Sequence, residues 1–345
     1  MSTLQIGLAI VGVLILAALV AHGIWSARKL APRQANPSDD APPADREPAA
    51  IEPSLDADEF GPPTVPQTLA EKRPGLDALI DVIAPIMLEA EVRGEAAVAA
   101  LPTTRRVGSK PFAVEGLNAV TLYWETPVAG HRYEAFQAGV QLANRSGSLN
   151  EIEFSEFVAK AQAFCDAVGG TPDFPDMIDE VARARELDQF ASGHDAQLGF
   201  TLRALSAAWS PGYVQQHAAR LGFVAGALPG RMVLPVAGLG LPPVLSLGFD
   251  TQAAMAEDPA QAAVREVSLA LDVAQVDRAE QPFVRLRDVA QAMAQAMDGV
   301  VTDDNGRPLA RETMDTIGGE LESLYDTLQA RDLAAGSALA RRLFS

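Results

Sequence analysis

The sequence PFVRLRDVAQAMAQAMDGVVT occupies residues 282–302 and joins a helix pattern to a strand pattern. Apolar residues at helical spacing, with proline at the first position, predict a helix over 282–297. The helix is expected to end at Asp298 and Gly299, since glycine commonly follows the last helical turn. Residues 300–306 then predict a strand that runs into a turn. Helices and strands therefore alternate closely in this part of the chain.

The sequence on both sides of this stretch predicts further elements. A helix over 211–221 begins with Ser210 as its N-cap and proline at its first position. A closing helix covers 309–328. The predicted strands of this half are 197–204, 231–234, 244–250 and 266–273.

A similar order of elements occurs earlier in the chain. There, strands are predicted at 76–87, 112–117, 121–126 and 133–142, and helices at 94–101, 154–168 and 176–190. The helical segment VAKAQA at 158–163 aligns with VAQAMA at 289–294. We therefore predict an α+β fold with a duplicated split βαβ module. Each antiparallel sheet would carry helices on one face and leave the other face open.

Residues 4–25, LQIGLAIVGVLILAALVAHGIW, contain no formally charged residue. A bilayer core requires about 20 apolar residues in a helix. Arg28, Lys29 and Arg33 follow this run, so the positive-inside rule places the large C-terminal part in the cytoplasm. A cleaved signal peptide is the alternative, but it normally has basic residues before its apolar core. The residues assigned to the anchor are Ile6, Leu8, Val11, Leu14, Leu16, Leu19 and Trp25.

The sequence after this run is rich in Pro, Ala, Asp and Glu, and we expect it to be a disordered, extended linker. Alternatively, this segment is a tail that plays no part in extending the reach of the folded domain from the membrane. The predicted divisions are a short extracytoplasmic N-terminus at 1–3, a transmembrane helix at 4–25, a linker at 26–75, a first α+β subdomain at 76–193, a second α+β domain at 194–330 and a tail at 331–345.

The net charge of −18 argues against nucleic-acid binding, which needs clustered Lys and Arg. The only cysteine, Cys165, cannot form an intramolecular disulfide, and we expect it to be a small core residue on a helix. The four histidines lack metal-ligand spacing, and no phosphate-binding or calcium-binding motif is complete. We therefore expect no enzymatic activity, no metal, no cofactor and no small-molecule substrate.

The order of an apolar anchor, a Pro- and acid-rich linker and a C-terminal split βαβ module resembles the ZipA family of bacterial division proteins. The closest local similarity is MDGVVTDDN at 297–305, and DAVGG at 166–170 is a fainter one. The resemblance covers the whole architecture, with 196–328 as the counterpart of the family module. It implies a single-pass protein of the bacterial inner membrane, with its N-terminus outside. Its implied partner is the C-terminal peptide of FtsZ, bound in a shallow apolar groove on the open sheet face.

This sequence departs from that pattern on the open face. Alternation along 244–250 and 267–273 gathers the leucines on one face, which we expect the helices to cover. The opposite face would be small and polar, while the first half would expose aromatics beside glycine. Those aromatics could instead pack between the two halves. The predicted partner-binding residues are Tyr123, Tyr133, Ala135, Gln137, Gly139, Thr201, Arg203, Met232, Ser246, Gly248, Ser268 and Ala270.

Two other functions are compatible with the sequence. A structural division or envelope scaffold could keep the fold without binding the FtsZ tail, and the polar open face favours this alternative. An anchored enzyme would need His131 and His194 to meet several carboxylates in one pocket.

Overall fold

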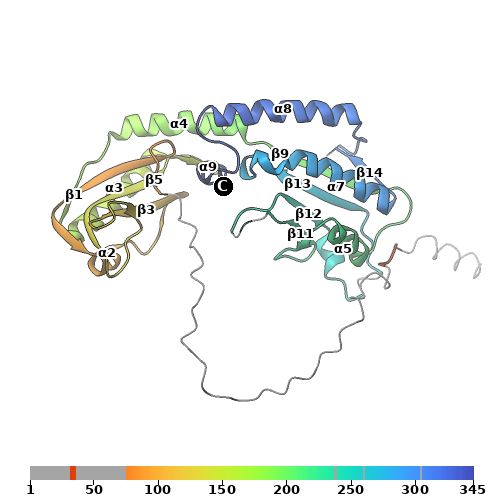
Figure 1. Ribbon diagram of the computed structural model, residues 1–345, viewed down its shortest axis with the longest axis horizontal. Helices are drawn as coiled ribbons and strands as arrows, with labels where there is room; N and C mark the ends of the chain where they lie inside the picture. Colours follow the sequence, from red (N-terminus) through yellow and green to blue (C-terminus); the bar gives the residue numbers. More distant parts are fainter. Residues whose placement is uncertain (1–31, 36–74, 237, 239, 259–260, 304) are drawn as a thin grey trace, which may run out of the picture. The chain divides into compact units, whose positions relative to one another are not determined.

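The computed structural model describes residues 32–35, 75–236, 238, 240–258, 261–303 and 305–345 (Figure 1). The predicted transmembrane helix at 4–25, and the predicted linker except 32–35 and 75, lie outside this part. Among the described residues, no helix combines the length and the apolar character needed to cross a bilayer.

The described chain divides into two compact units. The unit called here the second module comprises 32–35, Gln197–Asp272 and Ala279–Leu321. The first module comprises 75–196, Val273–Arg278 and Glu322–Ser345. Both combine helices with antiparallel sheet, so the predicted α+β class is confirmed.

The second module is built on one antiparallel sheet of order β10-β11-β12-β13-β9-β14. Figure 1 shows α7 lying along this sheet, and α7 contacts β9, β13 and β14. The elements are β9 (Gln197–Ala204), α5 (Pro211–Arg220), β10 (Val224–Ala225), β11 (Arg231–Leu234), β12 (Leu245–Phe249), α6 (Thr251–Ala254), β13 (Glu266–Asp272), η2 (Arg278–Glu280), α7 (Pro282–Met297), β14 (Gly299–Thr302) and α8 (Arg311–Gln329). Two of them cross the boundary between the units: the first residue of η2 and the last residues of α8 are counted with the first module.

Strand alternation determines which face of this sheet is covered. Leu247 pairs with Leu269, and Leu269 pairs with Phe200, so these apolar side chains share one face. All three are buried. The predicted leucine face is therefore the covered face.

At its C-terminal end, α7 leads directly into β14 and is hydrogen-bonded to Trp209, which precedes α5. Asp298 has a φ of 55° and ends the helix in the left-handed region, where its N–H donates to the Ala294 carbonyl. Gly299 then begins β14. The fully buried indole of Trp209 donates from Nε1 to the Met297 carbonyl at 2.7 Å. The helix stop predicted at Asp298 and Gly299 is confirmed.

The first module contains a sheet of order β2-β3-β5-β1-β8, with β4 paired to β3. Its elements are β1 (Asp81–Arg93), α2 (Gly94–Ala100), β2 (Arg106–Val107), β3 (Lys110–Asn118), β4 (Trp124–Glu125), β5 (Arg132–Gln141), β6 (Ala143–Asn144), β7 (Gly147–Ser148), α3 (Glu151–Val168), β8 (Gly170–Pro172), α4 (Met177–His194), η1 (Val273–Gln275) and α9 (Ala338–Leu343). The strand predicted at 121–126 is thus reduced to β4.

The core of this module lies between α3 and one face of its sheet. Phe136 on β5 packs edge-on against Phe164 on α3, with ring centroids 5.1 Å apart. Cys165 is fully buried on the same helix, which confirms the predicted core position. Burial raises the pKa of its thiol to about 11, so the thiol stays protonated and unreactive at neutral pH. Asn150 starts α3 by accepting hydrogen bonds from the N–H groups of Ile152 and Glu153.

The two sheets have the same strand order. In the first module, β2, β3, β5, β1 and β8 occupy the places that β11, β12, β13, β9 and β14 hold in the second. The helices α2, α3 and α4 follow the same strands in the chain as α5, α7 and α8 do. The segments 158–163 and 289–294 thus lie on corresponding helices, α3 and α7.

Residues 331–345, predicted as a tail, include α9 and belong to the first module. Leu343 and Phe344 are each only 1% exposed. Arg342 reaches the fully buried Asp81, with Nη2 at 2.5 Å from Oδ1. Burial raises the pKa of Asp81, and the Arg342 charge opposes that effect. The C-terminal segment thus neutralises a carboxylate at the start of β1.

Candidate partner-binding faces

The open face of the second module is small and polar, as the alternation predicted. Ser268 and Ala270 on β13 are exposed, and Ser246 and Thr201 beside them are half-buried. Arg203 is also exposed and pairs with Glu266 at 3.0 Å. Hydroxyl groups and small side chains here let a bound backbone approach closely and form hydrogen bonds, but they offer little apolar area.

Two residues predicted for this face are not available on it. Met232 is 6% exposed and pairs with Leu247, so it lies on the covered face, and its predicted place was wrong. A four-residue strand gives too little alternation to assign its faces. Gly248 is on the open face, but a Cβ there would lie 2.3 Å from Nη1 of Arg231. The Arg231 side chain therefore covers Gly248.

The first module also departs from the predicted open face. Tyr133 is fully buried, and its ring lies 5.4 Å from that of Phe136 on the covered face. Register shifts in the pairing of β5 with β1 and β3 explain the error, because they interrupt strict alternation. Tyr133 packs inside the first module, so the alternative of packing between the halves does not apply to it.

The remaining predicted residues of β5 do lie opposite the α3 side. Ala135 and Gln137 are half-buried, and Gln137 donates to Glu115 at 2.8 Å. Gly139 is buried because the Leu76 side chain occupies the space next to it; a Cβ at Gly139 would lie 2.5 Å from Leu76 Cδ2. Residues 75–76 thus partly cover this face, and a partner has little access to it.

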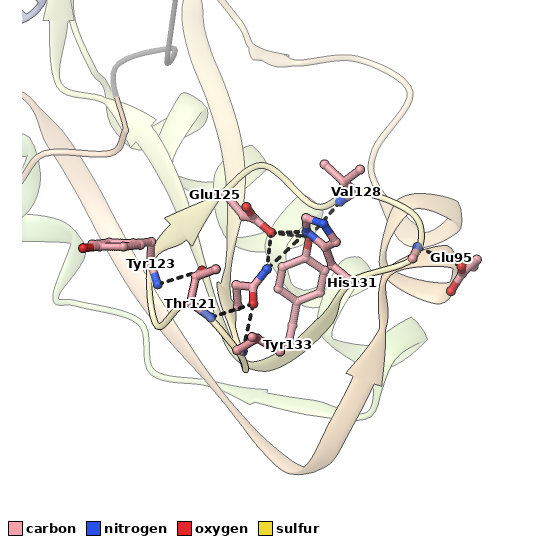
Figure 2. A network of polar contacts seen from close by, with 10 residues as sticks. Glu95, Thr121, Tyr123, Glu125, Val128, His131 and Tyr133 are labelled. Carbon is pink, nitrogen blue, oxygen red and sulfur yellow. Dashed lines mark hydrogen bonds and ion pairs between the residues drawn. The ribbon is translucent and has the colours of Figure 1, made fainter. Parts of the chain in front are cut away.

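Figure 2 shows the polar network that shapes the loop between β3 and β5. Asn118 Oδ1 accepts from the N–H groups of Val120 and Thr121 at 2.9 and 3.1 Å, which is the geometry of a side-chain-closed turn. Asn118 Nδ2 donates to Glu125 at 2.8 Å. The buried Asn118 side chain therefore binds both the start of the loop, at Val120 and Thr121, and Glu125 on β4.

Glu125 is the acceptor at the centre of this network (Figure 2). Its Oε1 lies 2.6 Å from His131 Nδ1 and accepts the Tyr133 hydroxyl at 3.1 Å. Partial burial acts to raise the pKa of Glu125, but hydrogen bonds from Asn118, His131 and Tyr133 outweigh it and hold the pKa below its ordinary value. Burial also raises the pKa of Tyr133, whose hydroxyl accepts from the Val128 N–H. Asn118, His131 and Tyr133 thus all bind the same carboxylate.

The tip of this loop exposes large apolar side chains. Val120, Leu122, Tyr123 and Trp124 are 87, 64, 67 and 37% exposed. Leu122 adopts a φ of 56°, a backbone conformation that non-glycine residues rarely take. Of these four, the sequence prediction included only Tyr123. Predicting a strand at 121–126 hid Leu122 and Trp124, because alternation places them on the face opposite to Tyr123; Val120 lies just outside that predicted strand. Clustered exposed aromatic and aliphatic groups are typical of partner-binding surfaces.

His131 and His194 do not lie in one site. His131 contacts Glu125, whereas His194 Nδ1 contacts the Phe190 carbonyl and its ring stacks on Phe190. Within the described residues, no three His, Cys, Asp or Glu side chains are grouped so as to hold a metal ion. The arrangement that an anchored enzyme would require is therefore not found at His131 and His194.

The second module is an α+β domain in which α7 packs on the sheet and the small, polar residues Ser268 and Ala270 are exposed. Within it, residues 254–319 match the family described as ZipA, C-terminal FtsZ-binding domain. They run from the end of α6 through β13, α7 and β14 into α8. On these residues the match confirms the resemblance to this family that the sequence predicted.

Other known proteins add little. No curated protein matches the chain. Among solved structures, berberine bridge enzyme from Eschscholzia californica aligns with 9% identity and a TM-score of 0.16, covering 76% of this chain and 53% of that one. The chain thus spans about half the length of that structure, and at this TM-score the likeness supports no conclusion.

Proposed function

We propose that this protein is a single-pass protein of the bacterial inner membrane that tethers FtsZ, and with it the Z ring, to the cytoplasmic side. The observation that carries the proposal is the match of 254–319 to the FtsZ-binding domain family, on the module that has an open sheet face. The uncharged run 4–25 and the basic residues after it support the anchor. The shared strand order of the two sheets supports a duplicated module.

The FtsZ tail would bind on the face that carries Thr201, Ser268 and Ala270. Because this face offers few apolar groups, we expect modest affinity for one tail. A filament presents many tails to many anchored copies, so weak single contacts suffice for stable attachment. No metal, cofactor or small-molecule substrate is needed for this function.

The test is a titration of a labelled FtsZ C-terminal peptide with the full-length protein in detergent micelles. We expect saturable binding in the micromolar range, about −7 to −8 kcal/mol. Ala270→Arg places a long side chain at the centre of the open face and should weaken binding at least about tenfold. Ala296→Arg adds the same side chain at an exposed site on α7 and should leave binding unchanged.

Absence of binding at high micromolar peptide would reject FtsZ-tail recognition. Binding that is insensitive to Ala270→Arg would reject the open face as the site.

A division or envelope scaffold that does not bind the FtsZ tail is the second candidate. The polar character of Ser246 and Ser268 favours it, since the family groove is apolar. In that case the exposed tip at Val120, Leu122 and Tyr123 is the more suitable partner surface. A fluorescent fusion that never reaches midcell would support the scaffold.

A further inference from the structure

Residues 32–35 lie against the second module as a short extended segment, drawn in red beside α5 in Figure 1. The Arg33 N–H donates to the Ala208 carbonyl at 2.7 Å, and the Ser210 N–H donates to the Arg33 carbonyl at 2.8 Å. Arg33 therefore pairs with Trp209 as a parallel bridge. Trp209 pairs on its other side with Val264. The segment thus adds a strand to a short ladder, a common mode of peptide recognition.

The Arg33 side chain is bound at the end of α7. Its Nη2 lies 2.6 Å from Asp298 Oδ2, and its Nη1 donates to the Met297 carbonyl at 3.3 Å. A helix C-terminus carries partial negative charge, which favours a guanidinium there. Ser206 Oγ donates to the same Asp298 oxygen at 2.5 Å and so helps to orient the carboxylate.

The receiving surface includes residues of the core of the second module. Trp209 is fully buried and its indole is tied to Met297. Ser210 is 3% exposed and caps α5 by accepting from the Tyr213 N–H. Because these groups are held by the core of the second module, the segment meets a surface that is already formed, which lowers the entropy cost of docking.

We propose that residues 206–210 together with Met297 and Asp298 form a docking site for residues 32–35 of the same chain. The sequence predicted one continuous linker that holds the folded part away from the membrane. The docked segment instead fastens the second module close to residue 25, although this module comes later in the chain. Six residues, 26–31, separate residue 25 from residue 32, so the two are at most about 25 Å apart when the chain between them is fully extended. The docking is independent of the proposed function, while its membrane-proximal consequence rests on the proposed anchor.

An engineered disulfide tests the docking directly. A Cβ at Gly212 would lie 3.8 Å from Ala35 Cβ, which is the usual spacing in a disulfide. We expect the full-length variant Ala35→Cys/Gly212→Cys to form an intramolecular disulfide under mild oxidation at least about tenfold faster than Ala50→Cys/Gly212→Cys, whose first cysteine lies elsewhere in the predicted linker. Adding Asp298→Ala should slow the first reaction. Equal rates for the two pairs would overturn the proposal.

Trypsin digestion of the unaltered protein gives a second readout that needs no substitution. The bond after Arg33 should be cut at least about tenfold more slowly than the bond after Arg46, since a docked strand must first detach. Asp298→Asn should reduce this protection, whereas Glu266→Gln, which removes a carboxylate from a separate ion pair, should not. Equal cleavage at both bonds would overturn docking. FtsZ-peptide binding measured on the same sample shows whether the proposed function fails with it.

Discussion

At the scale of single residues, a few buried polar groups determine the local geometry. Asn118 closes the loop below Val120 and also donates to Glu125. Glu125 in turn accepts from Tyr133 and contacts His131. A loop that exposes several apolar side chains is normally mobile, and this network counteracts that tendency. We therefore regard Glu125 as a structural acceptor that stabilises the first module.

Glu125→Gln should change how stability depends on pH. The pKa of Glu125 is below its ordinary value in the folded protein, so its ionised form contributes stability above the unfolded pKa of about 4.5. That contribution is lost as the pH falls through the folded pKa. Urea unfolding of both proteins should thus show the largest difference near pH 6 and little difference near pH 3. Thr121→Ala, which removes only a 3.5 Å contact, is the control. A difference that does not vary with pH would contradict this role.

The residue scale also shows what alternation can and cannot predict. Along β13 it correctly separated Leu269 from Ser268 and Ala270, because a regular strand alternates strictly. It failed at Tyr133, where a register shift interrupts the pattern. It was also uninformative for Met232, on a strand of four residues. Bulges and short strands are set by the partner strand, and a single sequence does not reveal them.

At the scale of elements, most helices and strands could be predicted because their boundaries carry local signals. Ser210 caps α5, and Gly169 ends α3 in the left-handed conformation with a φ of 71°. Contacts distant in sequence were not predictable. Nothing in the local pattern of 331–345 indicates that Arg342 pairs with Asp81, or that 32–35 pairs with Trp209.

The C-terminal segment should be essential for the stability of the first module. Arg342→Met keeps the apolar stem but leaves Asp81 buried without its cation, which should cost about 3 kcal/mol in unfolding free energy at pH 7. Since burial raises the pKa of Asp81, the loss should shrink as the pH falls toward 4 and the carboxyl is protonated.

The double variant Asp81→Asn/Arg342→Met removes both charges and should recover most of the lost stability. Arg331→Met, at an arginine that lies over the Phe190 ring, is the matched control and should have a smaller, pH-independent effect. If Arg342→Met were as stable as the parent at pH 7, the proposed stabilisation of the first module by the Arg342–Asp81 ion pair would be wrong.

At the scale of the whole molecule, the chain combines two modules of the same strand order, one of which matches the ZipA family. In the first module, residues 75–76 partly cover the sheet face, and the loop tip exposes apolar side chains. The second keeps an open face that is small and polar. Composition and the order of elements predicted the α+β class and the resemblance to the family that residues 254–319 match, whereas the surface a partner meets depends on packing between segments far apart in sequence.

Flotation of liposomes tests whether the second module links FtsZ to a bilayer, as we propose. The full-length protein is reconstituted into liposomes, mixed with FtsZ and centrifuged through a density gradient. We predict that FtsZ floats with the liposomes, that Ala270→Arg strongly reduces this fraction, and that Ala296→Arg does not. If FtsZ stayed at the bottom of the gradient while the reconstituted protein floated, the proposed tethering would be wrong.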